Sequence, residues 1–117
     1  METRNPSDPH NRRAHRRRGL RQPATLLLPG QQQREVMLCD LGLDGLSVMS
    51  SKPIAPGTRC ELRFELPGPS QSFPVDAMAK TVYSSFVGAD SFRIGLVFTD
   101  LPAAAQAAVA AFAIASP

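Results

Sequence analysis

Aromatic residues and histidines are scarce in this sequence, and that scarcity excludes some functions. The 117 residues include no tryptophan, one tyrosine and two histidines. Proteins that bind single-stranded nucleic acid usually stack the bases on aromatic side chains, and no aromatic cluster is interleaved with the basic residues here. His10 and His15 have no cysteine or carboxylate partner at metal-ligand spacing. The composition therefore argues against a specific nucleic-acid surface and against a metal site.

Cysteines and long apolar runs are also few. Cys39 and Cys60 stand apart rather than in a C-x-x-C pair, so we expect two reduced thiols that pack as small hydrophobic side chains. No segment has the positive start and apolar run of a secretory signal, and the longest apolar stretch, residues 103–115, is too short and too rich in alanine to span a bilayer. We therefore expect a cytoplasmic protein with no disulfide and no membrane insertion.

Motifs of catalysis are missing as well. The sequence has no phosphate-binding G-x-x-x-x-G-K, and no motif marks a nucleophile with its base. Both histidines lie in an N-terminal segment that we expect to be flexible, whereas catalysis needs groups held by a rigid scaffold. The sequence predicts a protein that is not an enzyme and that carries no cofactor.

Positive charge is concentrated at the N-terminus. The first 21 residues contain seven arginines against Glu2 and Asp8, although the net charge of the whole chain is only +3. The remainder is slightly acidic. A basic arm on a nearly neutral body indicates an anionic partner, which is a phosphodiester ligand, a nucleic acid or a membrane surface.

The chain is long enough for one modest hydrophobic core and hence for a single domain. Residues 1–11 are rich in Pro, Asn, Asp and Ser without hydrophobic periodicity, which predicts a disordered tail. We expect one domain over residues 12–117. It comprises a flexible basic arm at 12–23, a β-barrel at 24–99 and a C-terminal helix at 100–115.

Short apolar or alternating runs separated by Pro and Gly follow from Ala24 onward, a pattern typical of an all-β domain. The clearest strand is residues 58–66, where Cys60, Leu62 and Phe64 alternate with charged residues. The other strands are expected at 24–28, 34–40, 46–50, 73–83 and after Gly88. Six meandering strands without β-α-β alternation favour an antiparallel barrel, because closure removes exposed strand edges.

The last segment changes to helical spacing. Leu101, Ala105, Ala108, Val109 and Phe112 recur at the spacing of one helix face. Asp100 precedes them as an N-cap candidate. We expect this helix to close one end of the barrel.

Several Arg-x-x-x-Arg pairs overlap in the arm: Arg12 with Arg16, Arg13 with Arg17, and Arg17 with Arg21. Guanidinium groups bind phosphate oxygens in a bidentate manner, match the O6/N7 edge of guanine and stack on purines. A dinucleotide that contains guanine offers all three targets. The alternative is a solvated basic tail that binds polyanions without specificity.

A second motif, Asp-Leu-Gly-Leu-Asp-Gly, occupies residues 40–45. A carboxylate such as that of Asp40 accepts hydrogen bonds from the Watson–Crick edge of guanine, and glycine allows the backbone to approach a ligand. The alternative is an ordinary glycine turn between two strands. Asp40 and Asp44 by themselves lack the further ligands of a cation site.

Together the two motifs resemble the signature of the PilZ domain, R-x-x-x-R followed by Asp/Asn-x-Ser-x-x-Gly. Residues 92–101 resemble the final strand of that family, and residues 53–58 its Pro-Gly turn, so the resemblance runs from Arg12 to the C-terminus. It implies a six-stranded antiparallel barrel with a trailing helix. It also implies cyclic dimeric GMP (c-di-GMP) as the ligand and no catalysed reaction.

Carried over to this chain, the resemblance implies that Asp40 accepts the guanine edge and that Gly45 is the last glycine of the loop. Arg17 and Arg21 are the favoured arginine pair, because Arg21 directly precedes the entry to the first strand. Gly42 occupies the position of the family's serine, so one hydroxyl is missing from the expected ligand site. A single neutral hydrogen bond contributes about 0.5 to 1.5 kcal/mol, so this change need not abolish binding.

Arg12 with Arg16 is the competing arginine register. The resemblance implies a receptor that couples the second messenger to motility, biofilm or exopolysaccharide control through an unidentified protein partner. In that reading the arm folds onto the barrel when ligand binds. The alternatives are a degenerate adaptor that acts through protein partners without nucleotide, and a small barrel that binds RNA or DNA with the arm.

Overall fold

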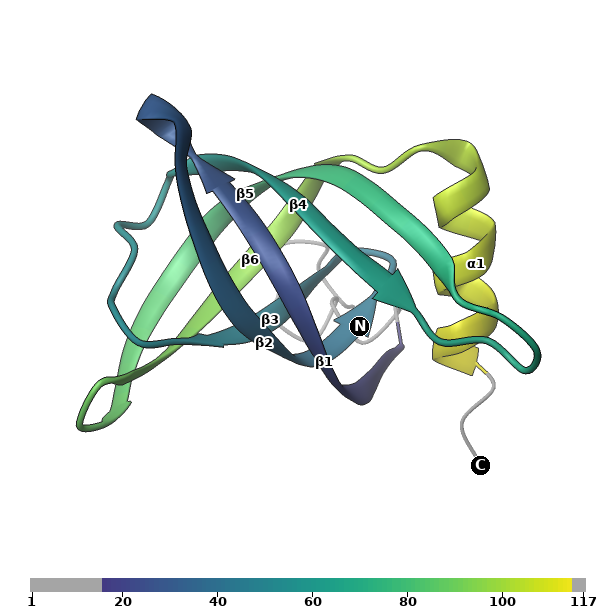
Figure 1. Ribbon diagram of the computed structural model, residues 1–117, viewed down its shortest axis with the longest axis horizontal. Coiled ribbons are helices and arrows are strands. Elements are labelled where there is room, and N and C mark those ends of the chain that lie inside the picture. Colours follow the sequence, from purple (N-terminus) through teal and green to yellow (C-terminus); the bar gives the residue numbers. More distant parts are fainter. Residues whose placement is uncertain (1–15, 115–117) are drawn as a thin grey trace, which may run out of the picture.

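The computed structural model describes residues 16–114, which form a closed barrel of six antiparallel strands and one helix (Figure 1). The elements are β1 (Arg17–Leu28), a short 3-10 turn η2 (Pro29–Gln31), β2 (Gln32–Gly42), β3 (Gly45–Ser50), β4 (Arg59–Leu66), β5 (Phe73–Gly88), β6 (Ser91–Asp100) and α1 (Ala103–Ile114). The strand order is β1-β2-β3-β6-β5-β4, and β4 pairs back with β1. The predicted antiparallel barrel with a C-terminal helix is confirmed. The expected tail, Arg12 and Arg13 lie outside the described residues.

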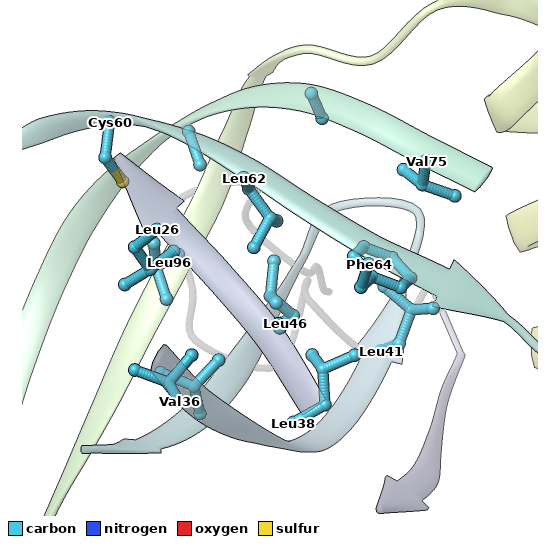
Figure 2. Close-up of a cluster of buried hydrophobic side chains, with 14 of the residues drawn as sticks. Leu26, Val36, Leu38, Leu41, Leu46, Cys60, Leu62, Phe64, Val75 and Leu96 are labelled. Carbon is cyan, nitrogen blue, oxygen red and sulfur yellow. The ribbon is translucent and has the colours of Figure 1, made fainter. Parts of the chain in front are cut away.

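The barrel interior is filled by alternate residues of the strands (Figure 2). The inward face of β4 carries the predicted residues Cys60, Leu62 and Phe64, all buried. Burial raises the pKa of the Cys60 thiol to about 11, so the thiol stays protonated at neutral pH and packs as a hydrophobic group. Cys60 and Cys39 are both free thiols.

β1 begins at Arg17, seven residues before the predicted start at Ala24, so residues 17–23 of the expected arm belong to the barrel. This stretch has no hydrophobic alternation, and its strand conformation comes from pairing with β2, as in Arg17 opposite Gly42. β4 pairs with β1 only from Ala24 onward. One side of the β1 backbone therefore has no strand partner before Ala24, and Pro23 is tolerated there although it lacks an N–H.

The C-terminal helix begins later than expected. Asp100 is not its N-cap, because it is the last residue of β6 and lies opposite Met78 of β5. The first helical hydrogen bond runs from the backbone N–H of Gln106 to the carbonyl of Pro102, at 2.8 Å. α1 buries Ala105, Val109 and Ala113 at intervals of four residues. Ala105 and Val109 belong to the predicted apolar face, whereas the predicted Ala108 and Phe112 are only partly buried.

Arg18 joins the start of β1 to the end of α1, which lies across one end of the barrel (Figure 1). Its Nη1 donates to the carbonyl oxygen of Phe112 at 3.0 Å, and its guanidinium lies 4.4 Å from the centre of the Phe112 ring. A cation at a helix C-terminus is favourable because the free carbonyls there carry partial negative charge. Within residues 16–114, no helix is long and apolar enough to cross a membrane.

Candidate ligand-binding site

Asp40 lies on the outer face of the barrel, in the middle of a row of paired residues. It is opposite Gly19 of β1 and Ser47 of β3. The pairing of β2 with β3 is irregular between Leu38 and Asp40. Such an irregularity turns side chains to a new direction, so the two flanking leucines, Leu38 and Leu41, remain in the core while Asp40 faces outward.

The Asp40 carboxylate is held by donors from three strands. Arg17 Nη1 donates to Oδ1 at 3.3 Å, and Arg93 Nη2 donates to Oδ2 at 2.9 Å. The hydroxyl of Ser47 also donates to Oδ2, at 2.9 Å, and accepts a hydrogen bond from Arg93 at 3.1 Å. Charge-assisted hydrogen bonds of this kind are the stronger ones in proteins. Asp40 is therefore fixed in place, with an arginine on each side.

Arg17 also contacts Asp44, in the turn between β2 and β3. Its Nε donates to Oδ1 and its Nη2 to Oδ2 of Asp44, both at 3.2 Å, which is a bidentate pair. Desolvation acts to lower the pKa of the Arg17 guanidinium, but the hydrogen bonds and charges of Asp44 and Asp40 outweigh it and raise that pKa. Arg17 is thus charged and bound to two carboxylates.

Tyr83 and Gly95 extend the same row across β6 and β5. Gly95 pairs with Ser47 on one side and with Tyr83 on the other. A Cβ on Gly95 would run into the Tyr83 ring, so the ring lies directly over the Gly95 backbone, and Tyr83 is still 40% exposed. Desolvation acts to lower the pKa of Arg93, but its interactions with Tyr83 and with the charge of Asp40 raise it overall. One outer face therefore presents a carboxylate, two arginines and an aromatic ring.

The structure does not bring all the predicted arginines to Asp40. Arg21 lines an open groove of about 520 Å³ together with Cys39, Met49 and Asp90. Its volume lies within the range of about 300 to 1,000 Å³ that is usual for small-molecule sites. Arg16 is exposed just before β1, and Arg12 lies outside the described residues. Arg17 is the predicted arginine that reaches Asp40.

The two predicted glycines are required by close approaches of the backbone. A Cβ on Gly42 would lie 2.5 Å from the carbonyl oxygen of Arg16, and a Cβ on Gly45 would run into the carbonyl of Leu96. Neither glycine has a positive φ. Gly42 and Gly45 therefore allow β2 and β3 to pack tightly against their neighbouring strands.

Sequence reasoning did not identify Ser47, Arg93 and Tyr83 as site residues. Each lies on a different strand from Asp40, and only the register of β3, β6 and β5 brings them together. One signal was present for Arg93, because it alternates with buried Ile94 and must face outward. Within the described part of the chain, no three His, Cys, Asp or Glu residues are grouped as a metal site.

Comparisons with known proteins agree with this architecture. The family model of the PilZ domain matches residues 11–115, and no curated protein sequence matches the chain. The Bacillus subtilis inhibitor of motility (MotI/DgrA) superposes with a TM-score of 0.76 at 12% identity, covering 98% of this chain and 51% of that one. The chain therefore spans about half the length of that protein.

Two further solved structures are similar. The PilZ domain of Escherichia coli YcgR, solved with c-di-GMP, has a TM-score of 0.67 at 16% identity and covers 89% of this chain and 90% of that one. Borreliella burgdorferi PlzA, in complex with c-di-GMP, has a TM-score of 0.51 at 18% identity and covers 74% and 30%. At such identities these likenesses show the fold. Because the family model covers nearly the whole sequence, the chain belongs to the PilZ domain family.

Proposed function

We propose that this chain is a cytoplasmic receptor domain for cyclic dimeric GMP. The observation that carries the proposal is the position of Asp40 on the outer face, between Arg17 and Arg93. Cyclic dimeric GMP has two phosphodiesters and two guanines. Arginine forks suit the phosphates and the O6/N7 edge of guanine, and a carboxylate suits its N–H donors. The c-di-GMP complexes of YcgR and PlzA support the choice of ligand.

In this proposal Asp40 accepts hydrogen bonds from one guanine, and Arg17 binds a phosphate. Arg21 contributes from the adjoining groove. Arg12 and Arg16 supply further positive charge from the segment before β1, while Gly42 and Gly45 contribute by letting the β2–β3 turn pack closely beside Arg17. Residues 12–117 act as one domain and 1–11 as a tail.

The output of the receptor is a changed surface rather than a chemical reaction. Ligand binding changes the outer face around Arg17 and Asp40 and thereby exposes or hides a surface for a protein partner. The family's link to motility, which the B. subtilis inhibitor illustrates by its name, makes motility the first output to test. Biofilm and exopolysaccharide control are further outputs.

A second candidate function is an adaptor that acts through a protein partner without nucleotide. Two observations favour it: Gly42 replaces the family's serine, and apolar side chains are exposed near the β5–β6 turn. Phe86 is 71% exposed and Val87 57% exposed there. Such a cluster is typical of a surface that meets another protein.

Calorimetric titration with cyclic dimeric GMP separates the two functions. We expect the wild type to bind it in preference to GTP and linear pGpG, and we expect Arg17→Ala to lose at least about tenfold in affinity, because a charge-assisted hydrogen bond contributes about 1.5 to 3 kcal/mol. Arg63→Ala is the matched control, since Arg63 forms an exposed pair with Asp76 on strands β4 and β5. Absence of heat and of thermal stabilisation in folded wild-type protein would favour the adaptor.

Tyr83 is expected to stack on a base of the ligand. Because stacking on an aromatic ring contributes about 1 to 3 kcal/mol per base, Tyr83→Ala should weaken binding about tenfold, whereas Tyr83→Phe should bind almost like the wild type. The chain has one tyrosine, so protein labelled with 3-fluorotyrosine gives one ¹⁹F resonance that reports on this position. Phe86→Ala, on an exposed aromatic near the hairpin turn, is the control. A resonance that does not shift at saturating ligand would place the bases elsewhere.

A further inference from the structure

The phosphate-binding edge of Arg17 is occupied by a carboxylate in this structure. A guanidinium binds a phosphate best along an edge where two N–H groups point the same way. The Nε/Nη2 edge of Arg17 lies on the two carboxylate oxygens of Asp44, at 3.2 Å each. Nη1 is directed to Asp40. A phosphodiester that approaches Arg17 therefore meets a competing carboxylate.

Asp44 is held in this position by its backbone. Its carbonyl oxygen accepts a hydrogen bond from the N–H of Phe98 at 3.1 Å, and the next residue, Gly45, is paired with Val97 of β6. The side chain is only 16% exposed. Across residues 16–114, the Asp44 carboxylate has Arg17 as its only hydrogen-bond partner. The backbone thus keeps the Asp44 carboxylate within reach of Arg17.

The net charge of the four charged side chains at the site also disfavours a phosphodiester. Arg17 and Arg93 are balanced by Asp40 and Asp44, so the four side chains sum to zero. A cyclic dinucleotide carries two negative phosphodiesters. In the proposed complex Asp40 accepts hydrogen bonds from the N–H groups of guanine. A phosphodiester offers no hydrogen-bond donor, so the Asp44 carboxylate only repels it.

We infer that Asp44 is an intramolecular competitor that occupies Arg17 in place of a ligand phosphodiester and thereby lowers the affinity of the site. The inference rests on the proposed function. By competing for Arg17, Asp44 sets the ligand concentration at which the receptor responds. Binding exchanges one bidentate pair of Arg17 for another, and the Asp44 carboxylate is released to water.

The test is a titration of Asp44→Asn with cyclic dimeric GMP. The variant should bind about tenfold more tightly than the wild type, which corresponds to about 1.4 kcal/mol at 25 °C. Asp44→Ser, which also removes the charge, should change the affinity in the same direction. Asp76→Asn is the matched control, because it removes one negative charge from an arginine pair on β4 and β5, and it should leave the affinity unchanged.

The outcomes separate this inference from the proposed function. If the wild type binds and both Asp44 variants bind equally or more weakly, Asp44 is a support for Arg17 and the inference alone is overturned. If the wild type and the variants are folded and none binds, the proposed function fails and the inference fails with it. Tighter binding by Asp76→Asn as well would attribute the gain to net charge rather than to Asp44.

Discussion

Replacing Asp40 with alanine is expected to reduce the affinity for cyclic dimeric GMP by at least about a hundredfold. The variant loses the acceptor for guanine, leaves Arg93 without its carboxylate partner and leaves Arg17 paired with Asp44 alone. Each charge-assisted hydrogen bond contributes about 1.5 to 3 kcal/mol. Losing two such bonds between Asp40 and guanine therefore lowers the affinity by at least about a hundredfold. Isothermal titration calorimetry of the wild type and of Asp40→Ala measures it.

The barrel should survive this substitution. Asp40 lies outside the hydrophobic core, although its side chain is only 23% exposed. Its loss leaves the buried Ser47 hydroxyl without its acceptor, which costs about 1 to 3 kcal/mol and is less than the usual stability of a domain, about 5 to 15 kcal/mol. Asp76→Ala provides the control, since it breaks an exposed pair with Arg63 away from the proposed site. If folded Asp40→Ala binds as tightly as the wild type, the ligand does not use this face.

The sequence predicts the barrel well because each strand from Ala24 onward either alternates or is bounded by Pro and Gly. In β4 the buried residues are those that a period of two selects, such as Leu62. In β6 the predicted Ile94 and Leu96 are buried, and Gly95 between them is buried too because it lies beneath the Tyr83 ring. The first part of β1 could not be predicted in this way. Residues 17–23 carry no apolar pattern of their own, and their extension depends on the backbone of β2.

The candidate site was only partly predictable for a related reason. Asp40 and Arg17 carry motifs that can be read along the chain, but Arg93 is 53 residues from Asp40 in sequence. Their contact depends on two successive strand registers, β2 with β3 and β3 with β6. Motif spacing contains no information on register. The role of Asp44 was equally hidden, since its partner is separated from it by the whole β1–β2 hairpin.

Gly42→Ser tests whether the serine of the family motif would strengthen ligand binding in this chain. On the sequence alone, this change restores the family motif and should strengthen binding. In the structure, a Cβ at this position would lie 2.5 Å from the carbonyl oxygen of Arg16 and 2.9 Å from Cγ of Arg17. The first of these atoms is backbone, so a rotamer change does not relieve the clash and the start of β1 must shift. We therefore expect the opposite result.

Forcing extra atoms into a packed site costs about 1 to 3 kcal/mol, which lowers the melting temperature of a domain of this size by roughly 5 to 15 °C. A shift of β1 also moves Arg17 away from Asp40, so the affinity for cyclic dimeric GMP should fall by about tenfold rather than rise.

Gly88→Ser is the control, because a Cβ on Gly88 meets nothing within 4 Å. A Gly42→Ser protein that melts at the wild-type temperature and binds more tightly would show that β1 accommodates the serine and that the hydroxyl is what the site lacks. A less stable, weaker-binding variant would instead mean that glycine at this position belongs to the strand pairing that presents Arg17 to the ligand.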